Sequence, residues 1–483
     1  MTEPLEIAAL YEKFAPTGAG KAMALRIAVR QAVRQALLRP MDELPSTRQA
    51  AKALSMSRNS VIEAYDGLTA EGVIQTRRGA RPRVCALPGA PGQTLTDMAD
   101  IPLSQRGRTL SAPHRAGYHL GEVEALAPGL PDPALFPQDA WATALRRAAR
   151  QQRGDQDMYA AFEGLPDLRE ALTLFLRRHR GVTVDPDQII VTPGTQSALA
   201  LMADLVSDPG DEVWMEDPGY AGGRAIFEAR GLQCRPLPDP LSPGGVAGDP
   251  RILYATPSTQ YPTGTRMKLN RRLDILALAE ARQSIVFEDD YDGDFVWRGT
   301  NVPPIFSLDK TGAVVLIGTV SKSLMPGLRL GWILVPKALI EPVREAHRAL
   351  GYCVNVQVQA ALADFIRSGQ FARHLRRSAK TYQQRMDSLT TALRAQLGNH
   401  VEISFPDGGL QTLVRIDADL DDRALSETLW HQGFQVLPLS RLCIESPARG
   451  LVVGFARADD AKSERFARAL AQALDEARPV TCT

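Results

Sequence analysis

The sequence predicts an α/β protein with two separate bodies, a small helical domain at the N-terminus and a large domain with a mostly parallel sheet. The chain has 483 residues, which is too long for a single core. Helical patterns dominate residues 20–72, with a short ribbon up to residue 84, whereas apolar strands alternate with helical segments from residue 126 to about residue 480. Residues 85–125 are rich in Pro, Gly, Ser and Thr and have no sustained period, which indicates a mostly unstructured or extended linker.

Charge separates the two bodies. The whole chain carries 56 Lys and Arg against 55 Asp and Glu, so its formal net charge is only +1. Residues 1–85, however, hold 13 basic against 8 acidic residues, a net charge of +5. A basic end on an acidic body indicates that the N-terminal part meets a polyanion.

The N-terminal domain, residues 1–84, is predicted to be a winged helix-turn-helix. Residues 20–38 form an amphipathic pattern in which Leu25, Val29, Val33 and Leu37 recur every four residues, and Pro40 ends it. Ser46 or Thr47 can then cap a short helix that runs to residue 54. After a tight turn, a second helix capped by Ser57 has the inner face Val61, Ala64, Tyr65 and Leu68, and a two-stranded ribbon turning near Gly79 follows it.

In this arrangement the second helix is the one expected to contact double-stranded DNA. Its first turn carries polar side chains that can contact phosphates and base edges, and the ribbon carries several arginines. The alternative is a solvated basic helical hairpin without a nucleic-acid partner. The predicted DNA-binding residues are Ser46, Arg48, Ser57, Arg58, Asn59, Ser60, Arg77 and Arg78, with Arg81 and Arg83 as further wing residues.

Other classes of protein are disfavoured by the composition. Five cysteines are scattered without paired spacing, which argues against a disulfide framework and against a zinc site, and no metal is expected. No apolar run approaches the ~20 residues that a membrane span needs, and no signal peptide is recognisable. We therefore expect a soluble, cytoplasmic protein with no membrane partner.

The large domain is predicted from six apolar strands with helical segments between several of them. In parallel sheets of this kind, ligands bind beyond the carboxyl ends of the strands. The residues that follow the strands are therefore the candidates for function. The predicted strands are 189–191, 213–215, 252–254, 285–287, 314–317 and 332–335.

Four of these strands are followed by residues that could hold one small molecule. Gly194 and Thr195 lie where a strand turns into a helix and could bind a phosphate, although most such turns serve packing alone. Tyr220 could cover an aromatic ring, or it could be a core tyrosine. The acidic run "EDDYDGDF" (288–295) could pair with a protonated ring nitrogen, or it could cap a helix or form a surface turn.

Lys322 follows the fourth of these strands, in "GTVSKSLMPGLRLGW" (318–332). A lysine between two apolar strands is costly unless its charge is used, and it could form a Schiff base with an aldehyde. Thr319, Ser321 and Arg329 could hold the phosphate of the same molecule. A phosphate cup, a stacking aromatic side chain, an acid for a pyridine nitrogen and a Schiff-base lysine together predict the cofactor pyridoxal 5′-phosphate, PLP.

With these residues in place, the chain resembles the MocR family of transcriptional regulators. Residues 20–84 are similar to a GntR-type winged helix, and residues 126–475 resemble a fold-type I PLP-dependent aminotransferase, a large domain followed by a small C-terminal α+β subdomain. The resemblance covers nearly the whole chain. Its markers are "LPSTRQAAKALSMSRNSVIEAYDGL", "APGLPDPALFP", "GLPDLREAL", "DPGY", "TPSTQYPTG", "EDDYDGDF" and "GTVSKSLMPGLRLGW".

The resemblance implies a role for each matching residue. Lys322 would form the internal aldimine, Asp289 would pair with the pyridine nitrogen, Tyr291 would bind the 3′ oxygen and Tyr220 would stack on the ring. The phosphate would be held by Gly194, Thr195, Thr319, Ser321 and Arg329. Tyr159 matches the tyrosine that reaches the phosphate of the neighbouring subunit, which implies a head-to-tail homodimer.

Three departures from the family patterns are visible. The Asn that begins "NPTG" in aminotransferases is Tyr261 here. The arginine that grips a substrate carboxylate on the last strand has no match in 450–456, so Arg441 becomes the candidate for an effector's acidic group, with a solvated surface arginine as the alternative. The wing lacks a second glycine often found in GntR domains. The first two departures argue against efficient transamination.

Three functions are compatible with this sequence. The first is a PLP-dependent DNA-binding regulator that senses a small amino compound through an external aldimine at Lys322. The second is a regulator that senses PLP itself. The third is an active aminotransferase with a DNA-binding tether. In each case we expect an operator with two half-sites if both winged helices of a dimer bind.

Overall fold

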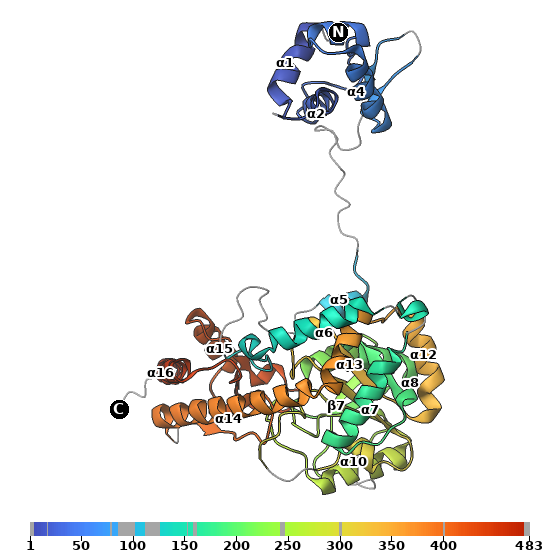
Figure 1. Cartoon of the computed structure of the whole chain (residues 1–483). Coiled ribbons are helices and arrows are strands. Elements are labelled where there is room, and N and C mark those ends of the chain that lie inside the picture. The colour runs from blue at the N-terminus through green and yellow to red at the C-terminus, as the bar shows by residue number, and fades with distance from the viewer. Residues whose placement is uncertain are drawn as a thin grey trace. The chain divides into compact units, whose positions relative to one another are not determined.

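The computed structural model consists of two compact units, Met1–Pro102 and Leu103–Thr483 (Figure 1). The residues described are 4–16, 18–77, 80–85, 102–111, 126–151, 153–157, 162–241, 247–298, 302–398 and 401–477.

The first unit has the predicted winged-helix elements. They are α1 (Pro4–Phe14), α2 (Lys21–Arg34), α3 (Thr47–Ala53), α4 (Arg58–Ala70) and an antiparallel pair, β1 (Ile74–Gln75) and β2 (Arg83–Val84). The Ser46 hydroxyl accepts a hydrogen bond from the Gln49 amide, and the Ser57 hydroxyl accepts one from the Ser60 amide at 3.0 Å. Both predicted N-caps are therefore confirmed. The predicted inner face of α4 is also confirmed, because Val61, Ala64, Tyr65 and Leu68 are all buried.

The first unit also departs from the prediction in two places. The first helix of the periodic pattern ends at Arg34, and the Ala36 backbone then turns with φ of +56°. Leu37, predicted to continue the apolar face, is consequently half-exposed, and Leu38 is buried in its place. Helix α1 was not predicted, although Ile7 packs fully into the core of this unit.

Part of the predicted linker is helical. Residues Gln105–Ser111 form α5, where unstructured or extended chain was expected. The helix has a local cause, because the Ser104 hydroxyl accepts a hydrogen bond from the Gly107 amide at 2.9 Å in the manner of an N-cap. A single serine before a seven-residue helix is a weak sequence signal. Helix α5 belongs to the second unit.

The second unit is built on a sheet in the order β3-β9-β8-β7-β6-β4-β5. Strands β5, β4, β6, β7 and β8 run parallel, and β9 is antiparallel to both of its neighbours, so the mostly parallel sheet is confirmed. All six predicted strands form, and β5 is one that the prediction missed. The bounds are β3 (Ile189–Thr192), β4 (Glu212–Met215), β5 (Gln233–Pro236), β6 (Pro250–Ala255), β7 (Ile285–Asp290), β8 (Val314–Thr319) and β9 (Gly331–Leu334).

Helices cover both faces of this sheet, because successive strand residues point to opposite sides. In β6, Ile252 and Tyr254 pack in one core with residues of α8, α9 and α12, whereas Leu253 and Ala255 pack in another with α10 and α11. The helices are α6 (Gln138–Arg150), α7 (Pro166–Arg180), α8 (Thr195–Val206), α9 (Ala221–Glu228), α10 (Leu269–Arg282), α11 (Ile305–Leu308), α12 (Ile340–Ala349) and α13 (Val356–Arg367). Single 3-10 turns lie at Pro133–Leu135, Gly154–Asp157, Pro186–Gln188, Pro326–Leu328, Lys337–Leu339 and Leu439–Arg441.

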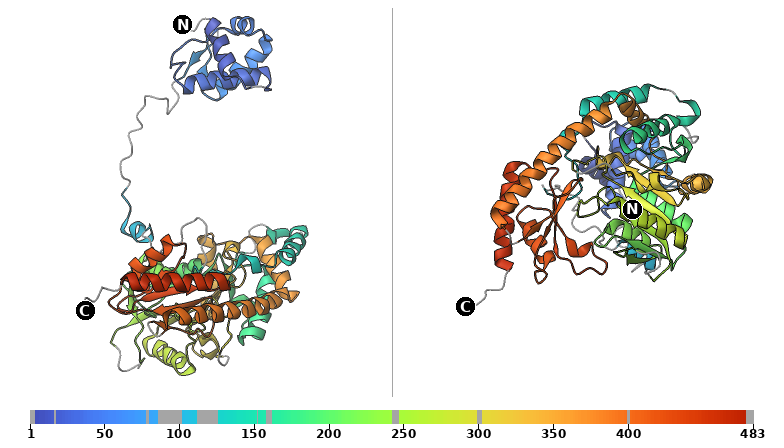
Figure 2. Two further views of the ribbon diagram at one scale, coloured as in Figure 1. Left: turned by 90° about the vertical axis from the view of Figure 1, so that its left-hand side faces the viewer. Right: turned by 90° about the horizontal axis from the view of Figure 1, so that it is seen from below.

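A smaller α+β subdomain ends the chain (Figure 2). Its sheet has the order β10-β11-β13-β12 and is antiparallel in the pairs β10–β11, β11–β13 and β12–β13. The long helix α14 packs against α16. The elements are α14 (Gln370–Leu397), β10 (Glu402–Ile403), β11 (Gln411–Arg415), α15 (Asp422–His431), β12 (Leu437–Pro438), β13 (Gly450–Gly454) and α16 (Asp460–Ala477). No helix in the described part of the chain has both the length and the apolar character needed to cross a membrane.

Candidate cofactor and effector site

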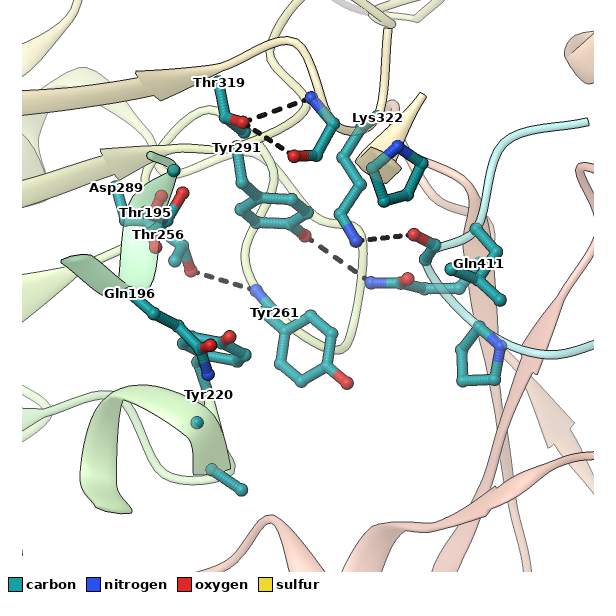
Figure 3. Close-up of a pocket in the computed structure, with 18 of the residues that line it drawn as sticks. Thr195, Gln196, Tyr220, Thr256, Tyr261, Asp289, Tyr291, Thr319, Lys322 and Gln411 are labelled. Atoms are coloured by element: carbon teal, nitrogen blue, oxygen red, sulfur yellow. Dashed lines mark hydrogen bonds between the residues drawn. The ribbon is translucent and has the colours of Figure 1, made fainter. Parts of the chain in front are cut away.

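The carboxyl ends of the central strands open into a cavity of about 250 Å³ (Figure 3). Ten of the predicted site residues line it, brought together from segments up to 247 positions apart in the sequence: Gly194, Thr195, Tyr220, Asp289, Tyr291, Thr319, Ser321, Lys322, Arg329 and Arg441. The predicted Tyr159 and Arg78 lie outside the described residues.

Lys322 reaches into this cavity from the turn between β8 and β9. Its Nζ donates a hydrogen bond of 2.5 Å to the Gly129 carbonyl oxygen, from a segment 193 residues earlier. Gly129 has φ of +69°, and a Cβ built there would lie 3.3 Å from the lysine Nζ. The absence of a side chain at position 129 therefore leaves room for the amine.

Asp289 lies at the end of β7, with 3% of its surface exposed. Its Oδ2 accepts a hydrogen bond of 2.8 Å from the Tyr254 hydroxyl, whereas its Oδ1 is buried without a hydrogen-bond partner in the described structure. Burial raises the pKa of the Asp289 carboxyl to about 7. A protonated pyridine nitrogen would supply both the missing donor and the missing positive charge.

The phosphate-binding candidates all line the cavity, and two of them are hydrogen-bonded to each other. The Thr319 and Ser321 hydroxyls are 2.9 Å apart, and Thr319 also accepts a hydrogen bond from the Ser321 amide. Gly194 caps α8 with φ of +122°, a conformation that favours glycine, so the first amides of α8 face the cavity without an intervening side chain. A Cβ at Gly194 would lie about 4 Å from the Arg329 guanidinium. These groups together suit a phosphate dianion.

Three tyrosines stand around the centre of the cavity. The ring of Tyr261 makes edge contacts with Tyr220 and Tyr291, with centroids 5.8 and 6.1 Å apart. Tyr261 therefore occupies the place between the predicted stacking tyrosine and the predicted 3′-oxygen donor. The core-tyrosine alternative for Tyr220 does not hold, since Tyr220 lines the cavity and is only half-buried.

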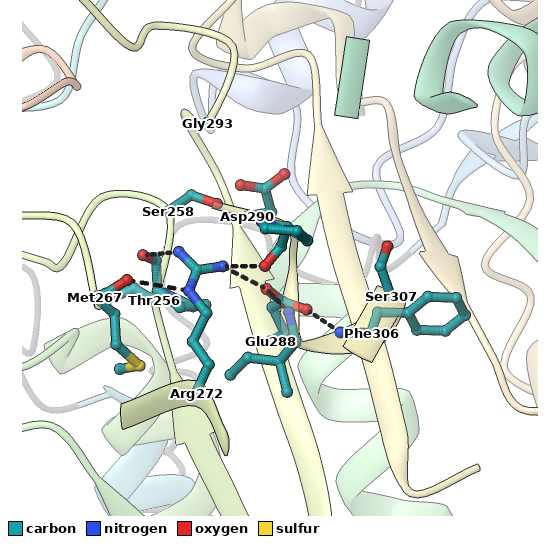
Figure 4. A network of polar contacts seen from close by, with 12 residues as sticks. Thr256, Ser258, Met267, Arg272, Glu288, Asp290, Gly293, Phe306 and Ser307 are labelled. Atoms are coloured by element: carbon teal, nitrogen blue, oxygen red, sulfur yellow. Dashed lines mark hydrogen bonds and ion pairs between the residues drawn. The ribbon is translucent and has the colours of Figure 1, made fainter. Parts of the chain in front are cut away.

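The acids on either side of Asp289 in "EDDYDGDF" have structural partners (Figure 4). Both Glu288 carboxylate oxygens accept hydrogen bonds from the amides of Ile305 and Phe306 at the start of α11, and Arg272 lies 3.9 Å away. Asp290 is paired with Arg180 at 2.6 Å. The helix-cap alternative thus describes Glu288, while Asp289 alone among these three acids has an oxygen without a partner among the described residues.

The sequence did not reveal several lining residues. Tyr254 lies near the carboxyl end of β6 and donates a hydrogen bond to Asp289. Its place at a strand end is the same kind of place that the predicted residues have. Gln411 comes from β11 of the small subdomain, and its Nε2 lies 3.5 Å from the Tyr291 hydroxyl. No local pattern marks Gln411 or Gly129, because only the tertiary fold brings Gln411 to Tyr291 and Gly129 to Lys322.

In the first unit, most predicted DNA-binding side chains are accessible. Arg48, Ser57, Arg58, Asn59 and Arg77 are exposed, and Ser46 and Ser60 are half-buried. Ser46 caps α3, and the Ser60 amide donates to the Ser57 hydroxyl that caps α4. The wing residue Arg83 donates a hydrogen bond of 2.8 Å to Glu43. Its charge is therefore partly neutralised within the domain, whereas Arg58 and Arg77 form no ion pair with another described residue.

Comparison with known protein families gives two matches on the chain. Residues 130–470 match the family "Aminotransferase class I and II", and residues 23–84 match "Bacterial regulatory proteins, gntR family". The "Probable rhizopine catabolism regulatory protein MocR" of Rhizobium meliloti is 36% identical over 437 residues, covering 87% of each chain. The chain belongs to the MocR family of transcriptional regulators.

Two further relatives of this MocR-family chain are informative. The "HTH-type pyridoxine biosynthesis transcriptional regulator PdxR" of Corynebacterium glutamicum is 30% identical over 89% of this chain and 91% of its own. Among solved structures, the α-aminoadipate aminotransferase LysN of Thermus thermophilus, complexed with N-(5′-phosphopyridoxyl)-L-leucine, covers 77% of this chain and 97% of its own, with a TM-score of 0.69 at 24% identity. That likeness shows the fold.

The family membership establishes the coarse function. This MocR-family chain is a DNA-binding transcriptional regulator whose GntR-type winged helix is joined to an aminotransferase-like domain, and its cofactor is PLP. The cavity fits that cofactor, since it offers a lysine amine, an orphaned buried carboxylate oxygen and a hydroxyl-rich anion cup. PLP supplies an electrophilic aldehyde carbon when it is bound, and Lys322, Asp289, Thr319 and Ser321 are residues that would hold it in this cavity.

Proposed function

We propose that this regulator senses a small amino compound that takes the place of the Lys322 amine on the aldehyde carbon of PLP. The observation that carries the proposal is that the Lys322 amine and Arg441 line the same cavity as the residues suited to hold PLP. Lys322 would hold the cofactor, with Asp289 at the ring nitrogen, Tyr291 at the 3′ oxygen and Tyr220 over the ring. Arg441 would receive an acidic group of the effector.

The same observations favour sensing over turnover. Tyr261 stands where aminotransferases have Asn, and its ring fills the space between Tyr220 and Tyr291. The strand β13 presents no arginine between Gly450 and Gly454. A ligand whose α-carboxylate is not bound by an arginine of this strand suits a regulator that binds its effector without converting it. The effector shifts DNA affinity only if it favours one conformation of the chain.

The DNA-binding arrangement is part of the proposal. We infer a head-to-tail homodimer in which Tyr159 reaches the phosphate of the neighbouring subunit, and an operator with two half-sites. Exposed Arg58 and Asn59 on the first turn of α4 support base or phosphate contacts by this helix. Replacement of Arg58 by Ala is expected to weaken operator binding and to leave the cofactor absorbance unchanged.

The experiment that tests the proposal is a visible absorbance titration of the PLP-loaded chain with a panel of amino compounds, followed by operator binding with each compound. A compound that shifts the cofactor band, stays bound and changes DNA affinity would be the effector. Release of a keto acid at many turnovers per chain would contradict the proposal in favour of an aminotransferase. An absorbance band that no compound shifts would also count against it.

Sensing of PLP itself is the second candidate. The relative from Corynebacterium glutamicum is named as a regulator of pyridoxine biosynthesis, and it is 30% identical along most of the chain. The two candidates separate in one measurement, which is operator affinity of the PLP-free and the PLP-loaded chain without any amine. A change of affinity on loading alone, with no further change on adding amines, would favour PLP as the signal.

A further inference from the structure

Helix α9 forms part of the cavity wall at its first turn. Tyr220 is its N-cap, and Ala221 and Gly222 follow on the cavity surface. A Cβ at Gly222 would lie 2.5 Å from the Tyr220 ring, so this turn is packed closely around the ring. Any change in the position of Tyr220 is therefore passed directly to the start of a helix of only eight residues.

Arg224 binds the same helix to a second segment of the cavity wall, which carries Arg441 and Leu442. Its guanidinium donates hydrogen bonds to the carbonyl oxygens of Cys443 at 2.6 Å and Arg441 at 3.1 Å. Between these two residues lies Leu442, whose carbonyl accepts a hydrogen bond from the Gly219 amide. Arg441 and Leu442 line the cavity on the effector side.

Asp217 completes this connection from the loop before α9. Its carboxylate accepts hydrogen bonds from three successive amides, those of Ile444, Glu445 and Ser446, at 2.8 to 2.9 Å. Hydrogen bonds therefore run in both directions between residues 217–224 and residues 441–446, which we call the latch. The latch therefore joins the segment that carries Tyr220 and α9 to the segment that carries Arg441.

Helix α9 also packs against α5, the helix in the segment that leads to the DNA-binding domain. Most side chains of α5 are exposed, and only Gly107 and Thr109 are half-buried. Its own turn is closed locally by Ser104 and by a 2.6 Å hydrogen bond from Arg108 to the Leu103 carbonyl. A helix held by so little buried surface is expected to detach readily when its support shifts.

We propose that α9 carries the state of the cavity to the linker, and that Arg224 is the positioning residue that ties α9 to the effector-side wall. Filling of the cavity fixes both walls, the latch holds α9, and α5 stays docked on it. Emptying of the cavity loosens α9 and frees α5. This inference rests on the proposed function and names the elements that would connect the cavity to the linker. Its test needs neither an amine nor DNA, so the inference and the proposed function can fail separately.

The experiment is amide hydrogen exchange of the full-length chain, with and without PLP, followed in peptides that cover residues 103–111. PLP is expected to slow exchange in this segment at least threefold in the wild-type chain. In Arg224→Ala the slowing is expected to fall to less than half of the wild-type effect, while the visible band of bound PLP persists. Arg224→Lys keeps the positive charge but loses the planar guanidinium that donates to two carbonyl oxygens at once. It is therefore expected to behave like the alanine variant.

Arg230→Ala is the matched control. Arg230 follows the same helix, is also largely buried, pairs with Asp204 and donates to the Ile226 carbonyl, and neither of these partners belongs to the latch. It should keep the wild-type effect of PLP. No PLP-dependent change at residues 103–111 in the wild-type chain would overturn the proposal. So would a wild-type effect in both Arg224 variants, or an equal loss in the Arg230 control.

Discussion

The two ends of the cavity are built in different ways. The cofactor end is made by residues at or just beyond the carboxyl ends of neighbouring strands of one sheet, such as Asp289, Thr319 and Lys322. The effector end is assembled from Gly129, Tyr261, Gln411 and Arg441, which come from loops and from the small subdomain. The first end is fixed by a rigid sheet, whereas the second depends on how two subdomains meet. Under the proposed function, the end that responds to an effector would be the one whose shape depends on the contact between the two subdomains.

Replacement of Lys322 by Ala is expected to have the largest effect on the cofactor end. The amine that joins the cofactor would be lost, so the visible band of the covalently held cofactor should disappear completely. The fold should persist, because Lys322 is only half-buried and its hydrogen bond is to one carbonyl. Absorbance after PLP addition and circular dichroism measure the two outcomes. A persisting band would place the covalent link on another residue.

Asp289→Asn is expected to weaken PLP binding by roughly 100-fold, because one partner of a buried charge pair is lost, a cost of about 3 kcal/mol. Fluorescence titration with PLP measures this. A change of less than about threefold would show that the ring nitrogen is not held by Asp289. Glu288→Gln, at a neighbouring acid with structural partners, should chiefly affect stability.

Asp289→Asn also allows a second test, in which the free energy of unfolding is measured as a function of pH. Burial holds the pKa of Asp289 at about 7 in the PLP-free fold, above its ordinary value of 3.8. Between these pH values the folded chain binds more protons at this group than the unfolded chain, so Asp289 lowers the free energy of unfolding as pH rises through this window. Asp289→Asn should remove that loss and stabilise the PLP-free chain near pH 8. Urea unfolding at several pH values checks the sign, and a steeper loss in the variant would contradict it.

Arg441→Ala tests the effector end. It is expected to reduce affinity for an acidic amino compound about tenfold, the effect of one lost charged hydrogen bond, and to leave PLP affinity within about twofold. Titration of the PLP-loaded chain measures both. Equal weakening of PLP and amine would mean that the two ends do not act separately.

Tyr254→Phe should have the smallest effect. It removes one 2.8 Å hydrogen bond to Asp289 without changing the shape of the core, a cost of about 1 kcal/mol, so PLP affinity should fall about fivefold. The variant tells whether Asp289 is oriented by its neighbour or by the strand alone. A change as large as that of Asp289→Asn would show that the carboxylate depends on this hydroxyl entirely.

Periodicity and strand ends predicted much of this molecule. The α4 face of Val61, Ala64, Tyr65 and Leu68 appears in sequence as a helical repeat, and six strands appear as apolar runs. Because parallel strands end at one edge of a sheet, the residues that follow them are expected to lie together, and the cavity lining confirms this. The ends of helices were harder to predict, as Leu37 shows. A single residue with positive φ, Ala36, redirects the chain there, and no periodic pattern in the sequence marks it.

The sequence by itself determined the two domain types, the cofactor and the cofactor end of the site, because each of these rests on local patterns whose geometry is known. Only the tertiary structure decided that Gly129 meets Lys322, that Gln411 meets Tyr291, that Tyr254 holds Asp289, and that Arg224 joins α9 to residues 441–443. These contacts span up to 219 positions along the chain, and no local periodicity encodes them. They exist because packing of the two subdomains places unrelated segments within hydrogen-bonding distance.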